Sequence, residues 1–176
     1  MRRVVIISTA SGNGKTTVGR ALADRLDVPF YELDALHHGP NWAEPTLEDF
    51  RARVEPLVQS DAWVIDGAYR GKLGDLVLAG ADLVVWLDLP LRVWLPRLVR
   101  RTASRVIRRE ELWNGNRERL RDALHPQNSV VFFALRHYRE RRQKYPSELA
   151  SFPVVRLRTT AEVDDFLRSA PRRGAK

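Results

Sequence analysis

The chain has 176 residues, of which 44% are hydrophobic and 30% charged, a composition typical of a soluble globular protein rather than a disordered one. It contains no cysteine, which excludes thiol catalysis, disulfide bonds and thiolate metal sites and fits a reducing cytosol, so we expect a cytoplasmic protein. No apolar run approaches the roughly 20 residues of a membrane-spanning helix, and we expect no membrane partner. The net charge of +8 admits either a nucleic acid or an anionic small molecule as partner.

Short apolar runs alternate with amphipathic stretches along the chain, a pattern typical of βαβ units. The pattern predicts strands at residues 4–8, 29–33, 63–66, 83–88 and 154–157, and helices at 15–26, 46–59, from about 91, 110–124, 129–142 and 161–168. Thr46 is a plausible N-cap of its helix, and Pro96 must lie near the start of its helix or bend it. We therefore predict an α/β fold with five parallel strands, helices on both faces, and ligands bound at the carboxyl ends of the strands.

Residues 8–17, STASGNGKTT, lie between the first predicted strand and the first predicted helix. They match the phosphate-binding P-loop pattern G-x-x-x-x-G-K-[ST] except that Thr9 stands where the first glycine is required. We expect this position to line only the mouth of the loop, so that Thr9→Gly would hardly change the affinity for the nucleotide.

The remaining residues of the loop suit a nucleotide with its metal ion. Two glycines let the backbone amides curl around phosphate oxygens, Lys15 places a charge near the β- and γ-phosphates, and Thr16 is placed to coordinate Mg²⁺. The sequence thus predicts a site for ATP and Mg²⁺, with ATP contacts from Ser11, Gly12, Asn13, Gly14, Lys15, Thr16 and Thr17.

Four blocks together resemble a known family: the loop at 8–19, LDALHHGPNW at 33–42, WVIDGAYR at 63–70 and VVWLDLP at 84–90. They are similar to adenylate-kinase-like P-loop kinases, in particular the topology-modulation (FlaR-like) branch. The resemblance covers about residues 3–168. It implies the three-layer P-loop NTPase fold of nucleoside-monophosphate kinases, with a five-stranded parallel sheet, a short lid, and phosphoryl transfer from Mg-ATP.

On this resemblance we expect one kinase domain over residues 1–170. It would include an acceptor-binding insert at about 35–60 and a lid at about 105–125. A basic tail at 171–176 would follow, which we expect to be disordered.

Two aspartates that follow predicted strands have different expected roles. Asp66 ends an apolar strand as a Walker-B carboxylate does, and the resemblance to adenylate kinases implies that it holds Mg²⁺ through water; the alternative is a helix N-cap. Asp34 is expected at the end of the second strand, and shikimate-kinase-like and gluconate-kinase-like relatives imply that it contacts the acceptor hydroxyl as a general base. Its alternative is a turn-forming role. Asp88 is interpreted as a structural strand stop before a proline.

Further acceptor contacts are expected from residues near these aspartates. Neighbouring side chains His37 and His38 point in different directions, so we expect an acceptor contact from His37, or a solvated loop, rather than a metal site. Trp42 either lines the acceptor site or anchors its loop. Tyr69 and Arg70 follow Asp66 closely, and an arginine can bind a phosphate or carboxylate through two hydrogen bonds.

A stripe of arginines is expected at the transferred phosphate. Arg97, Arg101 and Arg105 recur at four-residue spacing, which places them on one face of a helix. The resemblance implies that arginines on the helix entering the lid bind the phosphates, so Arg105 and Arg109 are expected to be catalytic and Arg101 to support ATP binding; the alternative is a solvated face. Arg158, after the last strand, is expected near the adenine.

Together these features predict an ATP-dependent kinase that acts on a small molecule. The expected acceptor is a nucleoside monophosphate or another nucleotide-like metabolite, and the alternative is a hydroxyl of a sugar acid or similar compound. A regulator that binds nucleic acid and uses ATP as a switch is the alternative of another class. No helix-turn-helix motif stands out, so we do not expect a nucleic-acid partner. A kinase acting on an amino-sugar nucleotide is a third alternative for the function. For the oligomeric state, the sequence allows a monomer or a homodimer.

Overall fold

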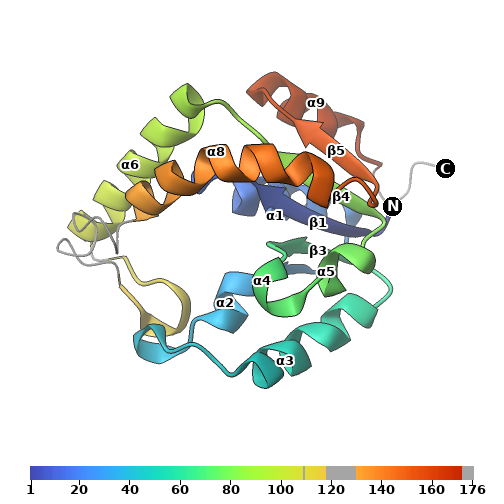
Figure 1. Cartoon of the computed structure of the whole chain (residues 1–176), viewed down its shortest axis with the longest axis horizontal. Helices are drawn as coiled ribbons and strands as arrows, with labels where there is room; N and C mark the ends of the chain where they lie inside the picture. Colours follow the sequence, from blue (N-terminus) through green and yellow to red (C-terminus); the bar gives the residue numbers. More distant parts are fainter. Residues whose placement is uncertain (109, 118–129, 172–176) are drawn as a thin grey trace.

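The computed structural model describes residues 1–108, 110–117 and 130–171, and the predicted α/β fold is confirmed in them (Figure 1). One parallel sheet runs through this part of the chain in the order β2-β3-β1-β4-β5. Its strands are β1 (Arg3–Ser8), β2 (Phe30–Glu32), β3 (Trp63–Asp66), β4 (Leu83–Leu87) and β5 (Val154–Leu157). The central strand β1 lies between β3 and β4. After β1 the chain passes to the β2 side of the sheet and after β4 to the β5 side, so the carboxyl ends of β1 and β4 form a topological switch point, where ligands bind in such sheets.

Helices cover both faces of the sheet, which gives the three-layer P-loop NTPase architecture. They are α1 (Lys15–Leu26), α2 (Leu33–His37), α3 (Leu47–Gln59), α4 (Arg70–Leu73), α5 (Leu76–Ala79), α6 (Leu91–Arg108), α8 (Val130–Glu148) and α9 (Thr160–Ser169). Two short 3₁₀ turns are η1 (Pro40–Trp42) and η2 (Trp113–Gly115). None of the helices in the described ranges is long and apolar enough to cross a membrane.

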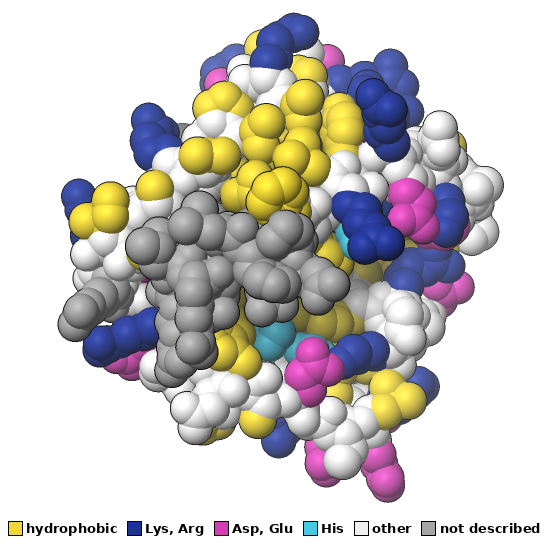
Figure 2. All heavy atoms as spheres, turned by 60° about the vertical axis from the view of Figure 1, so that its left-hand side comes forward, with side chains coloured by type: hydrophobic (Ala, Val, Ile, Leu, Met, Phe, Trp, Pro, Cys, Tyr) yellow, Lys and Arg dark blue, Asp and Glu magenta, His cyan; other side chains and the backbone are white. Residues whose placement is uncertain are grey.

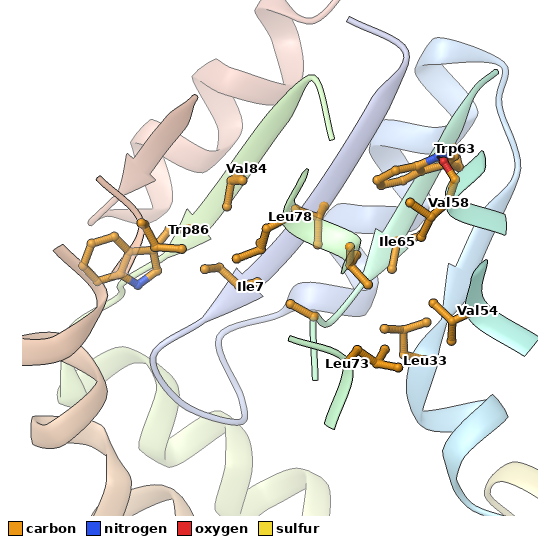
Figure 3. Packing of buried hydrophobic residues seen from close by; sticks show 14 of the residues in the cluster. Ile7, Leu33, Val54, Val58, Trp63, Ile65, Leu73, Leu78, Val84 and Trp86 are labelled. Atoms are coloured by element: carbon orange, nitrogen blue, oxygen red, sulfur yellow. Dashed lines mark hydrogen bonds between the residues drawn. The ribbon is translucent and has the colours of Figure 1, made fainter. Parts of the chain in front are cut away.

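The side chains of β1 contribute to two hydrophobic clusters, one on each face of the sheet, because successive side chains of a strand point to opposite sides. Val4 and Ile6 pack with α1 and α9, whereas Val5 and Ile7 pack with α3, α4 and α5. Figure 3 shows the second cluster, in which Trp63 and Ile65 of β3 meet the side chains of the covering helices. Both faces are therefore apolar, as an all-parallel sheet requires.

Several predicted boundaries hold because they depend on local signals. The helix at 15–26 and the strand at 63–66 have the predicted bounds, and Thr46 caps α3 by accepting a hydrogen bond from the backbone N–H of Asp49 at 3.0 Å. Of the two alternatives for Pro96, a place inside the helix is the one found, since it is the sixth residue of α6.

The predicted helix at 110–124 is wrong where it is described. Glu111 pairs with Arg117 in an antiparallel bridge, and the turn between them is η2. Asn114 and Gly115 adopt positive φ angles of 55° and 80°, a conformation that asparagine and glycine tolerate and a helix does not contain. Residues 118–124, Arg109 and the tail at 172–176 lie outside the described residues.

Candidate active site

The loop between β1 and α1 has the shape of a phosphate cradle. Gly12 and Gly14 have φ angles of 88° and 87°, and a Cβ on Gly12 would lie 2.7 Å from the carbonyl oxygen of Trp94. Gly14 is the N-cap of α1, whose first-turn N–H groups have no partner within a helix and so suit an anion.

The side chain of Asn13 holds this loop from inside. It is buried, donates to the carbonyl oxygen of Ala10 at 2.9 Å and accepts from the backbone N–H of Leu89 at 3.2 Å. The predicted ATP contact of Asn13 therefore has only its backbone available.

Thr9, at the position of the missing glycine, is fully buried, and the expectation that it only lines the mouth of the loop is wrong. Its hydroxyl donates to Oδ1 of Asp88 at 2.8 Å and accepts from the indole N–H of Trp86 at 2.9 Å. The threonine thus anchors the base of the loop to β4.

Asp88 has the structural role expected of it, but with partners that the sequence did not indicate. Its other carboxylate oxygen accepts from Nη2 of Arg156 at 2.6 Å and from Nε of Arg142 at 3.2 Å. This buried carboxylate, at the end of β4, therefore joins Thr9 below the loop to β5 and α8.

A second carboxylate lies directly behind the loop. Asp66, the last residue of β3, is 5% exposed and accepts hydrogen bonds from the ammonium group of Lys15 and, at 2.6 Å, from the hydroxyl of Thr16. A hydroxyl and a carboxylate at hydrogen-bond distance are hard oxygen donors of the kind that Mg²⁺ prefers. The predicted metal residues, Thr16 and Asp66, are thus together and fit the ion.

The loop opens into a cavity of about 810 Å³. Within the described part of the chain it is lined by Ser8, Ala10, Ser11, Gly12, Asn13, Gly14, Lys15, Thr16, Thr17, Arg20, Phe30, Glu32, Asp34, Ala35, Arg101, Arg105, Glu111, Leu112 and Trp113. The structure therefore brings the predicted ATP-loop residues together with Asp34, Arg101 and Arg105.

Glu32 and Trp113 are cavity residues that the sequence reasoning missed. Glu32 ends β2 as the register partner of Asp66, forms an ion pair with Arg20, and accepts from the indole N–H of Trp113 at 3.0 Å. One signal was available for Glu32, since it is the last residue of a short strand, as Asp66 is of β3. Nothing in the sequence linked it to Trp113, which lies 81 residues away.

Asp34 lies in the first turn of α2 rather than at the end of the second strand, because β2 ends at Glu32 and α2 begins at Leu33. Its Oδ1 accepts a hydrogen bond from the phenol of Tyr69 at 2.6 Å. Burial, and then the nearby Asp34 carboxylate, raise the pKa of Tyr69, so the phenol keeps its proton and donates it.

The other expected acceptor contacts are described residues that do not line the cavity. His37 is buried against Phe50, with Nε2 2.6 Å from the ammonium of Lys72, and burial lowers the pKa of the imidazole. Arg70 forms ion pairs with Asp75 at 2.7 Å and Glu148 at 3.1 Å.

Two more residues lie away from their expected partners. Trp42 is 40% exposed, and its backbone N–H donates to the side chain of Asn116 at 2.8 Å. Arg158, expected near the adenine, uses its backbone N–H to bond Glu162 at 2.7 Å and is not among the described cavity residues.

The 111–117 segment, part of the predicted lid, is hydrogen-bonded to residues 35–42, which run from α2 to η1. The side chain of Asn116 is 3% exposed and donates to the carbonyl oxygens of Gly39 at 2.9 Å and Trp113 at 2.8 Å. Asn114 donates to the carbonyl oxygen of His38 at 2.5 Å. These amides hold Leu112 and Trp113 against the cavity.

Known kinases match the part of the sequence that forms this site. The shikimate kinase family model matches residues 11–41, which include residues 11–17 of the phosphate loop and Asp34. A shikimate kinase of Brucella canis is 24% identical over 169 residues, covering 88% of this chain and 84% of that protein. One from Ruegeria pomeroyi is 28% identical over 122 residues, covering 61% of this chain and 63% of that protein.

Solved structures share the fold over almost the whole chain. A shikimate kinase from Bacteroides thetaiotaomicron superposes with a TM-score of 0.58 at 15% identity, covering 95% of this chain and 94% of that one. A gluconokinase from Sinorhizobium meliloti gives 0.53 at 21% identity, covering 96% and 89%. The chain is thus an ATP-dependent P-loop small-molecule kinase, similar in sequence to shikimate kinases, and ATP with Mg²⁺ is the usual cofactor pair of such enzymes.

Proposed function

We propose that this kinase transfers the γ-phosphoryl group of Mg-ATP to a hydroxyl of a small hydroxylated acid, of the chemical class of shikimate or a sugar acid. The observation that carries the proposal is the position of Asp34, which lines the same cavity as Lys15 and Thr16. A carboxylate in the cavity of the phosphate loop can orient a hydroxyl and accept its proton. The curated relatives, named as shikimate kinases, support an acceptor of this class.

The charges around the cavity suit this reaction. Phosphoryl transfer depends mainly on positioning and on neutralising the charge of the phosphates. Lys15, Arg101 and Arg105 line the cavity and would bind the phosphate oxygens. Arg109, the other arginine expected to be catalytic, lies outside the described residues. Bound Mg²⁺, held by Thr16 and through water by Asp66, would neutralise part of the same charge. The acceptor hydroxyl would attack phosphorus as Asp34 takes its proton and ADP leaves.

A nucleoside monophosphate, the acceptor expected from the adenylate-kinase resemblance, has weaker support. The curated relatives are named as shikimate kinases, which favours a hydroxy acid. Either acceptor needs a cation for its phosphate or carboxylate, and Arg70, one of the arginines that could serve, is paired with Asp75 and Glu148. Because the blocks at 33–42 and 63–70 resemble the topology-modulation branch of these kinases, we propose that the chain belongs to that branch. The proposal also includes an acceptor insert at about 35–60, a lid at about 105–125, of which residues 109 and 118–125 lie outside the described residues, and a cytoplasmic location, where ATP is plentiful.

A nucleic-acid-associated regulator is less well supported by the surface. The face turned forward in Figure 2 carries exposed hydrophobic side chains between its Lys and Arg side chains. Val99 and Ile107 of α6 and Phe132 and Phe133 of α8 are 47% to 80% exposed. A face that binds a phosphate backbone would present a more continuous stripe of basic residues.

The test is ADP release from Mg-ATP with shikimate, gluconate and other sugar acids, and nucleoside monophosphates, with Lys15→Ala as the blank. We expect one hydroxy acid to raise turnover well above hydrolysis, and Asp34→Asn to lower that turnover at least 100-fold while ATP affinity stays within about twofold. A nucleoside monophosphate as the best acceptor would overturn the acceptor class. A flat panel with intact ATP binding would favour the regulator, which salt-dependent DNA binding would then test.

A further inference from the structure

Tyr69 lies in a backbone conformation that aromatic residues seldom adopt. It follows Asp66 and Gly67 at the end of β3, and its φ and ψ angles are 47° and 41°, in the left-handed region. A side chain with a Cβ is disfavoured there, and glycine would adopt the conformation more easily. A tyrosine at such a position is held by its surroundings, and strained positions of this kind gather at functional sites.

The contacts of Tyr69 explain what holds it. Its ring packs on His37 at 4.7 Å and on Phe50 at 5.1 Å between centroids. Its carbonyl oxygen accepts from the first turn of α4, at Lys72 and Leu73, both at 2.8 Å. The ring is thereby fixed between α2, α3 and α4, and its hydroxyl is directed at Asp34.

We propose that Tyr69 is a positioning residue for Asp34: its phenol holds Oδ1 of the carboxylate, so that Oδ2 remains for the acceptor hydroxyl. The hydrogen bond is 2.6 Å long and partly buried. A hydrogen bond to a charged carboxylate is about twice as strong as one between neutral groups, and it fixes the rotation of the side chain. Tyr69 itself is not among the described residues that line the cavity, so it acts through Asp34.

This inference rests on the proposed function, since it assumes that Asp34 acts on the acceptor. It replaces the direct acceptor contact expected of Tyr69 with an indirect role. The conservative variant Tyr69→Phe keeps the ring packing and removes only the hydroxyl. Tyr31→Phe is a matched control, because Tyr31 is a partly buried tyrosine of β2 that packs on the same hydrophobic cluster.

The experiment is a double-mutant cycle on the full chain with shikimate as the first acceptor probe, followed by the best acceptor of the panel. We expect Tyr69→Phe to lower kcat about tenfold while the KM for ATP stays within about twofold, and Tyr31→Phe to leave both unchanged. In an Asp34→Asn background, Tyr69→Phe should cause no further loss, since it acts through that carboxylate. An unchanged kcat, or a full tenfold loss in the Asp34→Asn background, would overturn the proposal.

A second cycle separates this inference from the proposed function. The natural chain, Tyr69→Phe, Asp34→Ala and the double variant are unfolded in urea, which requires no phosphoryl acceptor. Alanine replaces asparagine in this cycle, because an asparagine amide oxygen would still accept a hydrogen bond from the phenol. We expect the two substitutions to be coupled by about tenfold in the unfolding equilibrium constant, because each removes the same hydrogen bond. If every acceptor fails, the proposed function fails, and this coupling alone decides the inference: additive effects on stability overturn it.

Discussion

Thr9 and Asp88 form a hydrogen bond of 2.8 Å beneath the phosphate loop, and both side chains are almost completely buried. The same threonine hydroxyl accepts from Trp86, and the same carboxylate binds Arg156. A glycine at position 9 could not make this connection. The departure from the P-loop pattern therefore provides an anchor between the end of β1 and the end of β4.

Removal of the Thr9 hydroxyl should destabilise the protein. Thr9→Val keeps the shape but leaves Asp88 and the Trp86 indole each short of a buried partner, and we expect the free energy of unfolding to fall by about 1–3 kcal/mol. Urea denaturation measures this. Thr9→Ser keeps the hydroxyl and serves as the comparison for the loss of the methyl group; a Thr9→Val variant as stable as the natural chain would show that the hydrogen bond contributes nothing.

The two loop glycines should respond differently to an added methyl group. In Gly12→Ala the new Cβ would meet the Trp94 carbonyl oxygen at 2.7 Å and the Leu98 Cβ at 2.9 Å. Gly14 has nothing within 4 Å, so Gly14→Ala adds only the cost of a left-handed φ, about 1–2 kcal/mol. Gly12→Ala should cost about 1–3 kcal/mol more and displace the loop from α6.

Thermal denaturation and ATP titration calorimetry of both alanine variants compare these effects directly. We expect the lower melting temperature and the weaker ATP binding for Gly12→Ala. A larger loss of stability in Gly14→Ala would contradict the predicted steric origin.

The Asn116 side chain should control the opening of the 111–117 segment. Asn116→Ala removes its two donated hydrogen bonds and the acceptor of the Trp42 N–H. We expect the Trp42 amide to exchange with deuterium at least tenfold faster, because its protection depends on that acceptor. Hydrogen-exchange NMR on the full chain measures this rate, with Asn114→Ala as the comparison, since Asn114 does not bond Trp42. Unchanged exchange in Asn116→Ala would refute the prediction.

Asp82 should make a pH-dependent contribution to stability. It accepts from the backbone N–H groups of Arg2 and Arg3 at 2.8 and 3.0 Å and pairs with the Arg3 guanidinium. The backbone hydrogen bond from Arg2, followed by those from Arg3, lowers the pKa of Asp82 to about 2 from 3.8. A lowered pKa in the folded state gives stability that is present above pH 3.8 and is lost as the pH falls towards 2.

Asp82→Asn isolates this contribution. The pKa difference corresponds to about 2 kcal/mol, which solvent screening of this partly exposed side chain reduces to about 1 kcal/mol. The variant should melt at a lower temperature than the natural chain at pH 7, and the difference should shrink between pH 4 and pH 2. A difference that is constant over this range would contradict the assignment.

Much of the fold was predictable because its signals are local. The glycine-rich loop, the apolar strand before it and the amphipathic helix after it are contiguous in the sequence, and so are Thr46 and the helix that it caps. The error at 110–124 has a local cause as well. The pattern before Asn114 suits a helix, but the left-handed Asn114-Gly115 turn directs the chain back into an antiparallel bridge.

Local motifs were enough to predict the class of site: a phosphate loop with Lys15 and Thr16, and an aspartate at the end of β3. The contacts between distant residues became clear only in the folded chain. Tyr69 reaches Asp34 across 35 residues, Arg156 reaches Asp88 across 68, and Trp113 reaches Glu32 across 81. These contacts could not be predicted, because strand order, register and helix packing set the distances together, and no local propensity or spacing carries that information.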